Sequence, residues 1–433
     1  MLIRTVINTD LNIERKEDLY KLKPLIENGG LKVNQTEIAR ALDIDRRTVK
    51  KYIGGYEPPA HRDRTKQMDQ YYELIKELLG SDTQRFYYRR VLYQYLKDNH
   101  KIEVKPGTFY YYLKTVKEFD DYFQRGKIST RKSDPVIRFE TGKGEQAQLD
   151  WKEGVRFVLK DTGEEITINV LVLLLSYSRF RVYKLALQMT RDVVLHLLTE
   201  MFEEIGGVTR TLLTDNMKTV MDKARSHYMP GVENKEFEAF AKDFGFKTVP
   251  CIAKSPQTKG KVEAPMKILD EICAYSGKLT LVELYDKVRE LNQRVNSQFN
   301  QGTNRIPIDD FQKEKDSLLH LPPVSVRNQY RIKTTKVKVN TASMINIRSN
   351  QYSVPSRYIG RSVEYQIHDG NVYVYYNTRL IAAHALSDKK LNYSQEHYVD
   401  IIAARYKGRD GDEITQMAKE NLTLIGERYA SSQ

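Results

Sequence analysis

Gln146-Ala147-Gln148-Leu149-Asp150-Trp151 predicts a buried strand that ends at an acid, and two later stretches repeat this arrangement. Thr211-Leu212-Leu213-Thr214-Asp215-Asn216 predicts a short buried strand followed by an acid. In Ser255-Pro256-Gln257-Thr258-Lys259-Gly260-Lys261-Val262-Glu263, the acid begins a predicted helix. Side chains at the ends of such elements can meet while a sheet holds them rigid. We therefore expect three carboxylates to converge: Asp150, Asp215 and Glu263.

Strands and helices alternate around these stretches. Runs rich in β-branched and apolar residues predict further strands at Val155–Leu159, Ile166–Leu175, Arg179–Leu187 and Lys247–Pro250. Apolar residues at helical spacing predict helices at Asp192–Ile205, Glu236–Phe244 and Lys261–Tyr275. Strands followed by alternating helix and strand predict a mixed sheet covered by helices. We assign residues 136–278 to this α/β core and residues 279–320 to a helical connector.

Three converging carboxylates suit divalent-cation chemistry. Mg²⁺ prefers oxygen ligands, and two such ions about 3.5–4 Å apart can clamp a phosphate. We expect two Mg²⁺ ions, with Mn²⁺ as an alternative, and in-line phosphodiester chemistry without a covalent protein intermediate. Lys259 and Lys261 flank the third acid and are expected to steer a phosphate. The ordinary alternatives are a solvated cap at Asp150, a turn at Asp215-Asn216 and a helix-surface pair between Glu263 and Lys267.

Composition indicates a nucleic-acid partner. The chain has 433 residues and a formal net charge of +13, which suggests a polyanion; the alternative is a basic protein with no such partner. Cys251 and Cys273 are its only cysteines, so no disulfide framework or zinc set is expected, in keeping with a reducing cytoplasm. Without an apolar run of about 18 residues, neither a membrane span nor a signal peptide is expected.

Residues 1–56 predict a helix-turn-helix. Apolar spacing predicts helices over Leu19–Ile26, Thr36–Leu42 and Arg46–Ile53, and Asp45 is placed to cap the third. This basic third helix suits the major groove of double-stranded DNA. The residues expected to contact DNA are Arg46, Arg47, Thr48, Lys50 and Lys51. The alternative is a helical bundle with a solvated basic face.

Residues 62–124 predict a second helical DNA-binding unit. Its third helix opens at Pro106, and the tyrosines that follow either contact phosphates or belong to the core. The expected DNA contacts are Arg89, Arg90, Thr108 and Tyr110. Residues 125–135 form a basic linker in which Arg131 and Lys132 are expected to cross the DNA backbone.

Short strands return in residues 321–390. Gly360 and Asp369-Gly370 lie at turns, and the pattern predicts a small β-barrel. Ser317–Val363 contains no Asp or Glu but eight Lys and Arg, so a contact with the DNA backbone is expected there. The candidate contacts are Arg331, Lys333, Lys336 and Lys338. Residues 391–433 predict a helical tail.

On these residues the chain resembles the retroviral-integrase-like DDE recombinases and, more closely, the IstA-type transposases of insertion-sequence family twenty-one. The likeness covers nearly the whole chain and rests on Thr36–Ile53, Gln148–Trp151, Leu213–Lys218, Lys259–Glu263 and Asn350-Gln351-Tyr352-Ser353-Val354-Pro355. It implies an RNase H-like catalytic core with the three acids as metal ligands. One departure from simpler integrases is the strand Val155–Leu159, expected as an inserted hairpin strand.

The resemblance also implies partners. It implies binding to the terminal inverted repeats of a mobile element by a homodimer or higher oligomer that pairs two ends. It further implies an AAA+ ATPase helper, for which the tail after Ser394 is a candidate docking site. We thus expect a multidomain α+β transposase of the bacterial cytoplasm and nucleoid, which exposes 3′ ends and joins them to target DNA.

Two other functions are considered. A catalytically inactive sequence-specific DNA-binding regulator is disfavoured because all three acids are present. An RNase H-like structure-specific nuclease is disfavoured because two sequence-reading units and a third basic domain accompany the core.

Overall fold

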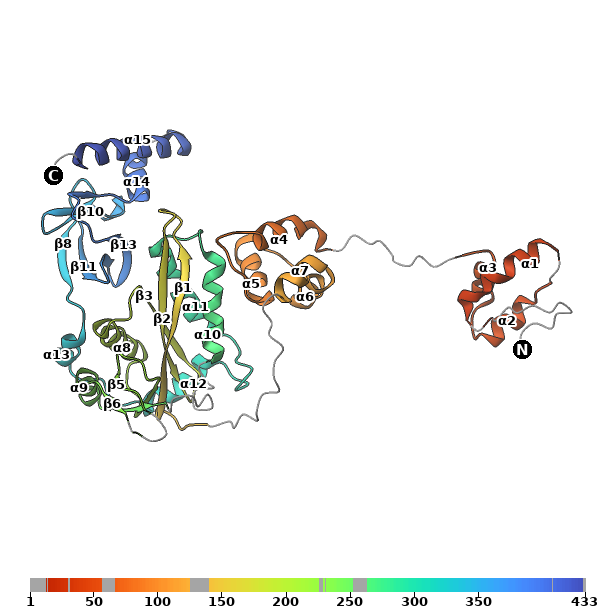
Figure 1. Ribbon diagram of the computed structural model, residues 1–433, viewed down its shortest axis with the longest axis horizontal. Helices are drawn as coiled ribbons and strands as arrows, with labels where there is room; N and C mark the ends of the chain where they lie inside the picture. The colour runs from red at the N-terminus through yellow and green to blue at the C-terminus, as the bar shows by residue number, and fades with distance from the viewer. Residues whose placement is uncertain are drawn as a thin grey trace. The chain divides into compact units, whose positions relative to one another are not determined.

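The computed structural model describes residues 13, 15–29, 32–56, 67–124, 140–225, 229, 231–251, 263–406 and 408–430, with only the backbone at 263–265 and 430. The chain divides into two compact units, Met1–Asp69 and Gln70–Gln433, and each is described by itself (Figure 1). The predicted basic linker and the candidate DNA contacts Arg131, Lys132, Lys259 and Lys261 lie outside the described residues. Within the described ranges, no helix is both long and apolar enough to cross a bilayer.

The first unit is a small helical bundle. Its elements are the 3₁₀ helix η1 (Lys16–Leu22), α1 (Lys23–Glu27), α2 (Gln35–Ala41) and α3 (Arg46–Ile53). Leu19, Leu22, Ile38 and Val49 are buried in a shared core. The predicted cap of α3 is confirmed, because the Arg47 amide donates to the Asp45 carboxylate at 2.7 Å.

The second unit begins with four short helices after η2 (Asp69–Tyr71). They are α4 (Tyr72–Leu79), α5 (Arg89–His100), α6 (Pro106–Thr115) and α7 (Lys117–Gln124). Tyr112 is buried, as the core alternative for the tyrosines requires, whereas Tyr111 is 67% exposed. The extended backbone of Val116 ends α6, so α7 is a separate helix that the sequence pattern did not resolve.

A mixed sheet forms the centre of the second unit, as predicted. Its strands are β1 (Gln146–Val158), β2 (Glu165–Leu175), β3 (Arg181–Ala186), β4 (Thr211–Thr214) and β7 (Lys247–Pro250). The order is β3-β2-β1-β4-β7, with β1 antiparallel to β2 and parallel to β4. A two-stranded ribbon, β5 (Met221–Lys223) and β6 (Val232–Glu233), follows β4.

Helices cover both faces of this sheet (Figure 1). One face, called here the α8 face, packs against α8 (Arg191–Ile205) and α9 (Lys235–Phe244) through a large apolar core. The opposite face carries α10 (Glu263–Leu269), the 3₁₀ helix η4 (Asp270–Tyr275) and α11 (Leu281–Ser297). The helix predicted at Lys261–Tyr275 therefore becomes 3₁₀ over its second half.

The strand predicted at Val155–Leu159 pairs with β2 as a hairpin, but the prediction that it is separate from Gln146–Trp151 is wrong. Gln146–Val158 is a single strand whose pairing with β2 shifts between Lys152 and Val155. Gly154 lies in the left-handed region at φ 65° and donates its amide to the side chain of Asn169 at 2.9 Å. This bulge absorbs the extra residues, so pairing resumes and β1 continues. Asp150 consequently lies inside a strand and does not end one.

After the connector helices α12 (Pro307–Glu314), η5 (Lys315–Ser317), α13 (Val324–Arg327) and η6 (Asn328–Tyr330), the chain becomes β-rich. The strands are β8 (Thr335–Lys338), β9 (Met344–Ile347), β10 (Asn350–Ser353), β11 (Ser362–His368), β12 (Asn371–Tyr376), β13 (Arg379–Ala385) and β14 (Leu391–Asn392), with η7 (Ser356–Tyr358) after β10. They form two sheets, β13-β12-β11-β8 and β14-β10-β9, around a common core. A closed barrel is not confirmed, and β13 and β14 were not predicted. The helical tail is confirmed as α14 (Gln395–Arg405) and α15 (Gly411–Ala430).

Candidate active site

Two of the three predicted acids lie at neighbouring parallel strands, with Asp150 inside β1 and Asp215 directly after the end of β4. Leu149 of β1 is in register with Thr214 of β4, so the next residues along each strand are Asp150 and Asp215. Adjacent strands are about 4.8 Å apart, which brings the two backbones within reach of a shared ligand. Asp150 is half-buried and Asp215 is exposed.

Strand alternation indicates the face of the sheet to which each aspartate belongs. Ala147 and Leu212 are register partners, and both belong to the apolar core on the α8 face. Because successive side chains along a strand point to opposite faces, residues an odd number of positions later point away from α8. Asp150 is three positions after Ala147 within β1 and so belongs to the face that carries α10 and η4. Asp215 is three positions after Leu212 but one residue past the end of β4, so the same orientation is an expectation for it.

An ion pair holds η4 against this face. Lys152 follows Asp150 by two residues, and its ammonium lies 2.6 Å from the carboxylate of Asp270, the first residue of η4. η4 continues directly from α10, which begins at Glu263. The helix that carries the third acid therefore lies on the same side of the sheet as Asp150.

Metal ligation by all three acids stays a prediction. The side chain of Glu263 lies outside the described residues, and the described side chains alone form no cluster of three His, Cys, Asp or Glu suited to a metal ion. Asp150 and Asp215 supply carboxylate oxygens, which are the donors that Mg²⁺ prefers.

Asn216 fixes the backbone that follows Asp215. The side-chain nitrogen of Asn216 donates to the backbone carbonyl of Cys251 at 3.0 Å. Its side-chain oxygen accepts from the backbone N–H of Arg225 at 2.8 Å. Arg225 in turn donates to the Pro250 carbonyl at 3.0 Å. The sequence predicted only a turn at Asp215-Asn216 and missed this role. An Asn directly after a strand-terminal Asp was the available signal, but its partners are known only from the fold.

Of the two buried cysteines, Cys273 is disfavoured as a nucleophile by its surroundings. Burial, with a smaller contribution from Asp270, raises the pKa of Cys273 to about 11. The thiol is therefore protonated at neutral pH, whereas the thiolate is the reactive form. This agrees with chemistry that needs no covalent protein intermediate.

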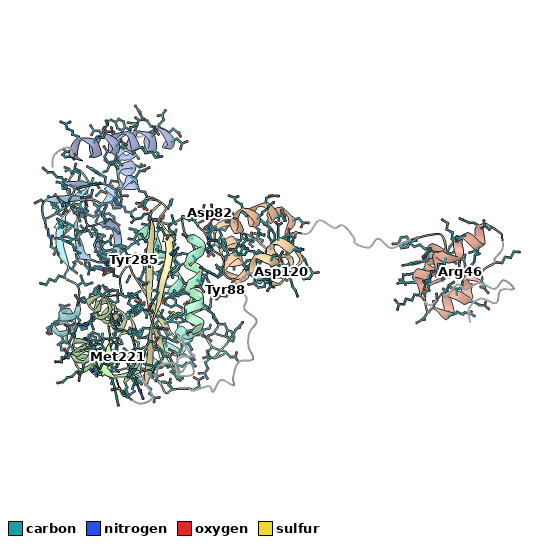
Figure 2. The ribbon with its side chains drawn as sticks, in the orientation of Figure 1. Arg46, Asp82, Tyr88, Asp120, Met221 and Tyr285 are labelled. Carbon is teal, nitrogen blue, oxygen red and sulfur yellow. The ribbon has the colours of Figure 1, made fainter. Side chains whose placement is uncertain are left out.

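The basic residues predicted on α3 are available to a ligand. Arg46, Arg47, Lys50 and Lys51 are exposed, while Thr48 is half-buried. The opposite side of α3 packs into the core of the unit. Figure 2 marks Arg46, at the start of this helix. Contact with DNA stays a prediction.

The basic residues predicted on α5 are instead engaged within the protein. Arg89 forms an ion pair with Asp120 of α7 (labelled in Figure 2). Arg90 lies 2.8 Å from the Glu271 carboxylate and donates to the Lys267 carbonyl at 2.9 Å. These contacts compete with any role of the two arginines in binding phosphates.

The remaining candidate DNA contacts differ in whether their side chains are exposed or engaged within the protein. Thr108 is exposed, while Tyr110 is half-buried with its ring 6.0 Å from Tyr93. Arg331 pairs with Glu203 of α8, which disfavours a DNA contact. Exposed lysines remain on or next to β8: Lys333, Lys336, which lies 3.6 Å from Glu364, and Lys338.

The chain is similar to known transposases. The family model "Mu transposase, C-terminal domain" matches residues 321–394. The transposase for insertion sequence element IS232 of Bacillus thuringiensis subsp. berliner is 46% identical over 434 residues, which is 100% of both chains. The transposase for insertion sequence element IS21 of Pseudomonas aeruginosa is 26% identical over 383 residues, 86% of this chain and 90% of the relative. The catalytic core domain of BIV integrase aligns with a TM-score of 0.30 at 14% identity, covering 40% of this chain and 97% of that one.

Proposed function

Because this chain belongs to the IS21 family of insertion-sequence transposases, we propose that it binds the terminal inverted repeats of a mobile element, exposes their 3′ ends and joins those ends to target DNA. The observation that carries the proposal is the register of β1 and β4, which sets Asp150 beside Asp215. The helix that begins at Glu263 lies on the same face of the sheet. We assign an RNase H-like architecture to this core.

The donor set fits Mg²⁺, with Asp150, Asp215 and Glu263 as proposed ligands. Bound divalent cations would supply activation of the attacking hydroxyl and stabilisation of the leaving 3′ oxygen. The protein's own contribution is to hold the carboxylates still. β1 and its neighbours fix Asp150, Asn216 fixes the backbone after Asp215, and the ion pair of Lys152 with Asp270 holds η4 against β1.

DNA recognition is proposed for the first unit and for the C-terminal β region. α3 presents its exposed cations as a recognition helix for the major groove. The lysines on or next to β8 contact the DNA backbone, whose phosphates attract them without regard to sequence. Family membership supports a homodimer or higher oligomer that pairs two ends on bacterial DNA. It also supports an AAA+ ATPase helper, docked on α14 and α15.

An Asp150→Asn substitution tests the proposal. The full-length protein is incubated with Mg²⁺, labelled element ends and target DNA, and strand transfer is measured beside end binding. Wild type is expected to give joined products, and Asp150→Asn to abolish them while end binding is retained. Glu153→Gln is the matched control, because it removes an exposed carboxylate from the same strand and is expected to keep activity. Joining by Asp150→Asn at the wild-type rate would show that the site is assigned wrongly.

A further inference from the structure

The second helical unit is attached to the segment that follows α10. The Gln84 side chain donates to the Ala274 carbonyl at 2.5 Å, and the Arg85 amide donates to the Cys273 carbonyl at 3.0 Å. The rings of Tyr95 and Tyr275 pack with centroids 5.1 Å apart. These residues of the helical unit therefore bind η4, the direct continuation of α10, rather than being free to follow DNA independently.

Arg90 binds the far end of α10 itself. One guanidinium nitrogen lies 2.8 Å from the Glu271 carboxylate, and the other donates to the Lys267 carbonyl at 2.9 Å. Lys267 is in the last turn of α10, and Glu271 is the second residue of η4, so Arg90 contacts both sides of the joint between these helices. A single side chain from α5 thus contacts both the helix that begins at Glu263 and the start of η4.

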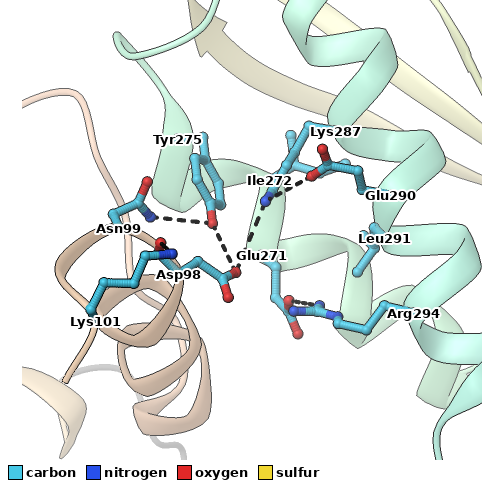
Figure 3. Close-up of a pocket in the computed structure, with 10 residues that line it drawn as sticks. All are labelled: Asp98, Asn99, Lys101, Glu271, Ile272, Tyr275, Lys287, Glu290, Leu291 and Arg294. Atoms are coloured by element: carbon cyan, nitrogen blue, oxygen red, sulfur yellow. Dashed lines mark hydrogen bonds and ion pairs between the residues drawn. The ribbon is translucent and has the colours of Figure 1, made fainter. Parts of the chain in front are cut away.

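Glu271 extends this contact to α11. Its side chain is only 12% exposed, and its second oxygen accepts from Arg294 (Figure 3). Charge-assisted bonds of this kind are stronger than neutral ones, and removing one partner leaves a buried charge uncompensated. Glu271 therefore joins the helical unit, η4 and α11 at one point.

A cavity lies beside this junction, although Ile272, Cys273 and Ala274 of η4 are themselves buried. It has a volume of about 410 Å³, and its lining includes Asp98, Tyr275, Lys287 and Arg294 (Figure 3). Close-packed interiors hold an element in place from all sides, and a cavity removes that support on one side. The polar contacts of Arg90 and Glu271 therefore add to the apolar packing that holds η4.

We propose that Arg90 is a positioning residue, which sets the orientation of α10 and thereby the placement of the Glu263 carboxylate. Lys267 follows Glu263 by four residues, about one helical turn, so a shift at one is passed to the other. The second helical unit then controls the catalytic rate through this contact and does not use Arg90 to bind DNA. The inference rests on the proposed function, in which Glu263 is a metal ligand.

The test is Arg90→Ala in the full-length protein. Three quantities are measured: affinity for element ends, the single-turnover rate of strand transfer at saturating DNA, and the Mg²⁺ concentration that gives half the maximal rate. We expect unchanged affinity and a higher Mg²⁺ requirement. We also expect a rate lower by about 100-fold, the loss that a displacement of ~1 Å can cause. Arg90→Lys, which keeps a cation near Glu271, is expected to recover part of the rate.

Two further variants make the result specific. Lys97→Ala removes an exposed cation from the same helix and is expected to match wild type in all three quantities. Glu271→Gln keeps the side-chain shape, weakens both guanidinium contacts, and is expected to reproduce the Arg90→Ala pattern. If Arg90→Ala does not fold, Glu271→Gln still tests whether the junction positions α10.

Two outcomes overturn the inference. If Arg90→Ala weakens end binding while the rate and the Mg²⁺ requirement stay at wild-type values, Arg90 is a DNA contact. If Glu271→Gln behaves as wild type, the junction does not position α10. Either result leaves the proposed function standing, because that function is judged separately by Asp150→Asn.

Discussion

Two helices of the molecule begin with a pair of arginines, and the two pairs have different surroundings. Arg46-Arg47 opens α3 in the first unit, and Arg89-Arg90 opens α5 in the second. The first pair is exposed to solvent, whereas the second pair binds Asp120 and Glu271. A count of basic residues therefore does not tell which of them are available to DNA.

The difference has a physical cause at the start of each helix. A cation in the first turn is disfavoured by the helix dipole, so each arginine pair needs a compensating negative charge. α3 has one locally, since Asp45 caps it. α5 follows Tyr88, whose side chain makes no capping hydrogen bond. The arginines of α5 pair with the carboxylates of Asp120 and Glu271, which lie 31 and 181 residues further along the chain. Of the distantly paired arginines, Arg89 is half-buried, whereas Arg90 remains 42% exposed although it is paired.

The largest expected effect is on DNA binding by the first unit. Arg46→Ala with Arg47→Ala is expected to weaken binding to element ends by ~1–3 kcal/mol for each arginine that reads a base pair. The salt dependence of affinity is also expected to become shallower by about one for each DNA phosphate that the variant no longer neutralises. Titration of labelled ends at several salt concentrations measures both.

The matched control is Arg46→Lys with Arg47→Lys, which keeps the charge but not the bidentate geometry of guanidinium. It is expected to preserve the salt dependence and lose discrimination between end and unrelated DNA. Unchanged affinity in the alanine variant would make the first unit a protein-contact module.

A smaller effect, on protein stability, is expected when Arg89 is changed. The side chains of Arg89 and Asp120 are 25% and 29% exposed, so solvent screens their ion pair only in part. Arg89→Ala is expected to destabilise the second helical unit by about 1–2 kcal/mol, between the exposed and the buried cases. Hydrogen exchange of α5 and α7 measures this loss, and affinity for element ends should not change.

Asp120→Asn serves as the partner variant for Arg89. If the ion pair accounts for the effect, the two substitutions together cost less than the sum of each alone. A loss of DNA affinity in Arg89→Ala that Asp120→Asn does not share would return Arg89 to the DNA contacts.

The same contrast between local and distant partners explains what the sequence could predict of the fold. The predicted strand Ile166–Leu175 and helix Asp192–Ile205 agree with β2 and α8, since each pattern lies within its own element. The break predicted near Gly154 is wrong, because a bulge depends on pairing with β2 and on Asn169. The sequence around Gly154 alone does not show that β2 and Asn169 are its partners.

The candidate site follows the same rule. That an acid follows two of the predicted strands and begins one predicted helix was visible in the sequence. The proximity of Asp150 to Asp215 requires knowing that β1 and β4 are neighbours. The role of Asn216 depends on Cys251 and Arg225, which reach it through the fold. The placement of the Glu263 side chain stays a prediction.

The smallest expected effect is a loss of stability when Asp45, the cap of α3, is changed. Asp45→Ala removes both the acceptor of the Arg47 amide and the local negative charge, and is expected to destabilise the first unit by about 1 kcal/mol. Asp45→Asn keeps an acceptor and removes only the charge, so it is expected to cost less. Chemical unfolding followed by hydrogen exchange of α3 measures both. If Asp45→Asn costs as much as Asp45→Ala, the carboxylate acts mainly on the charges of Arg46 and Arg47. If neither substitution has an effect, the capping account of why α3 can leave its arginines exposed is wrong.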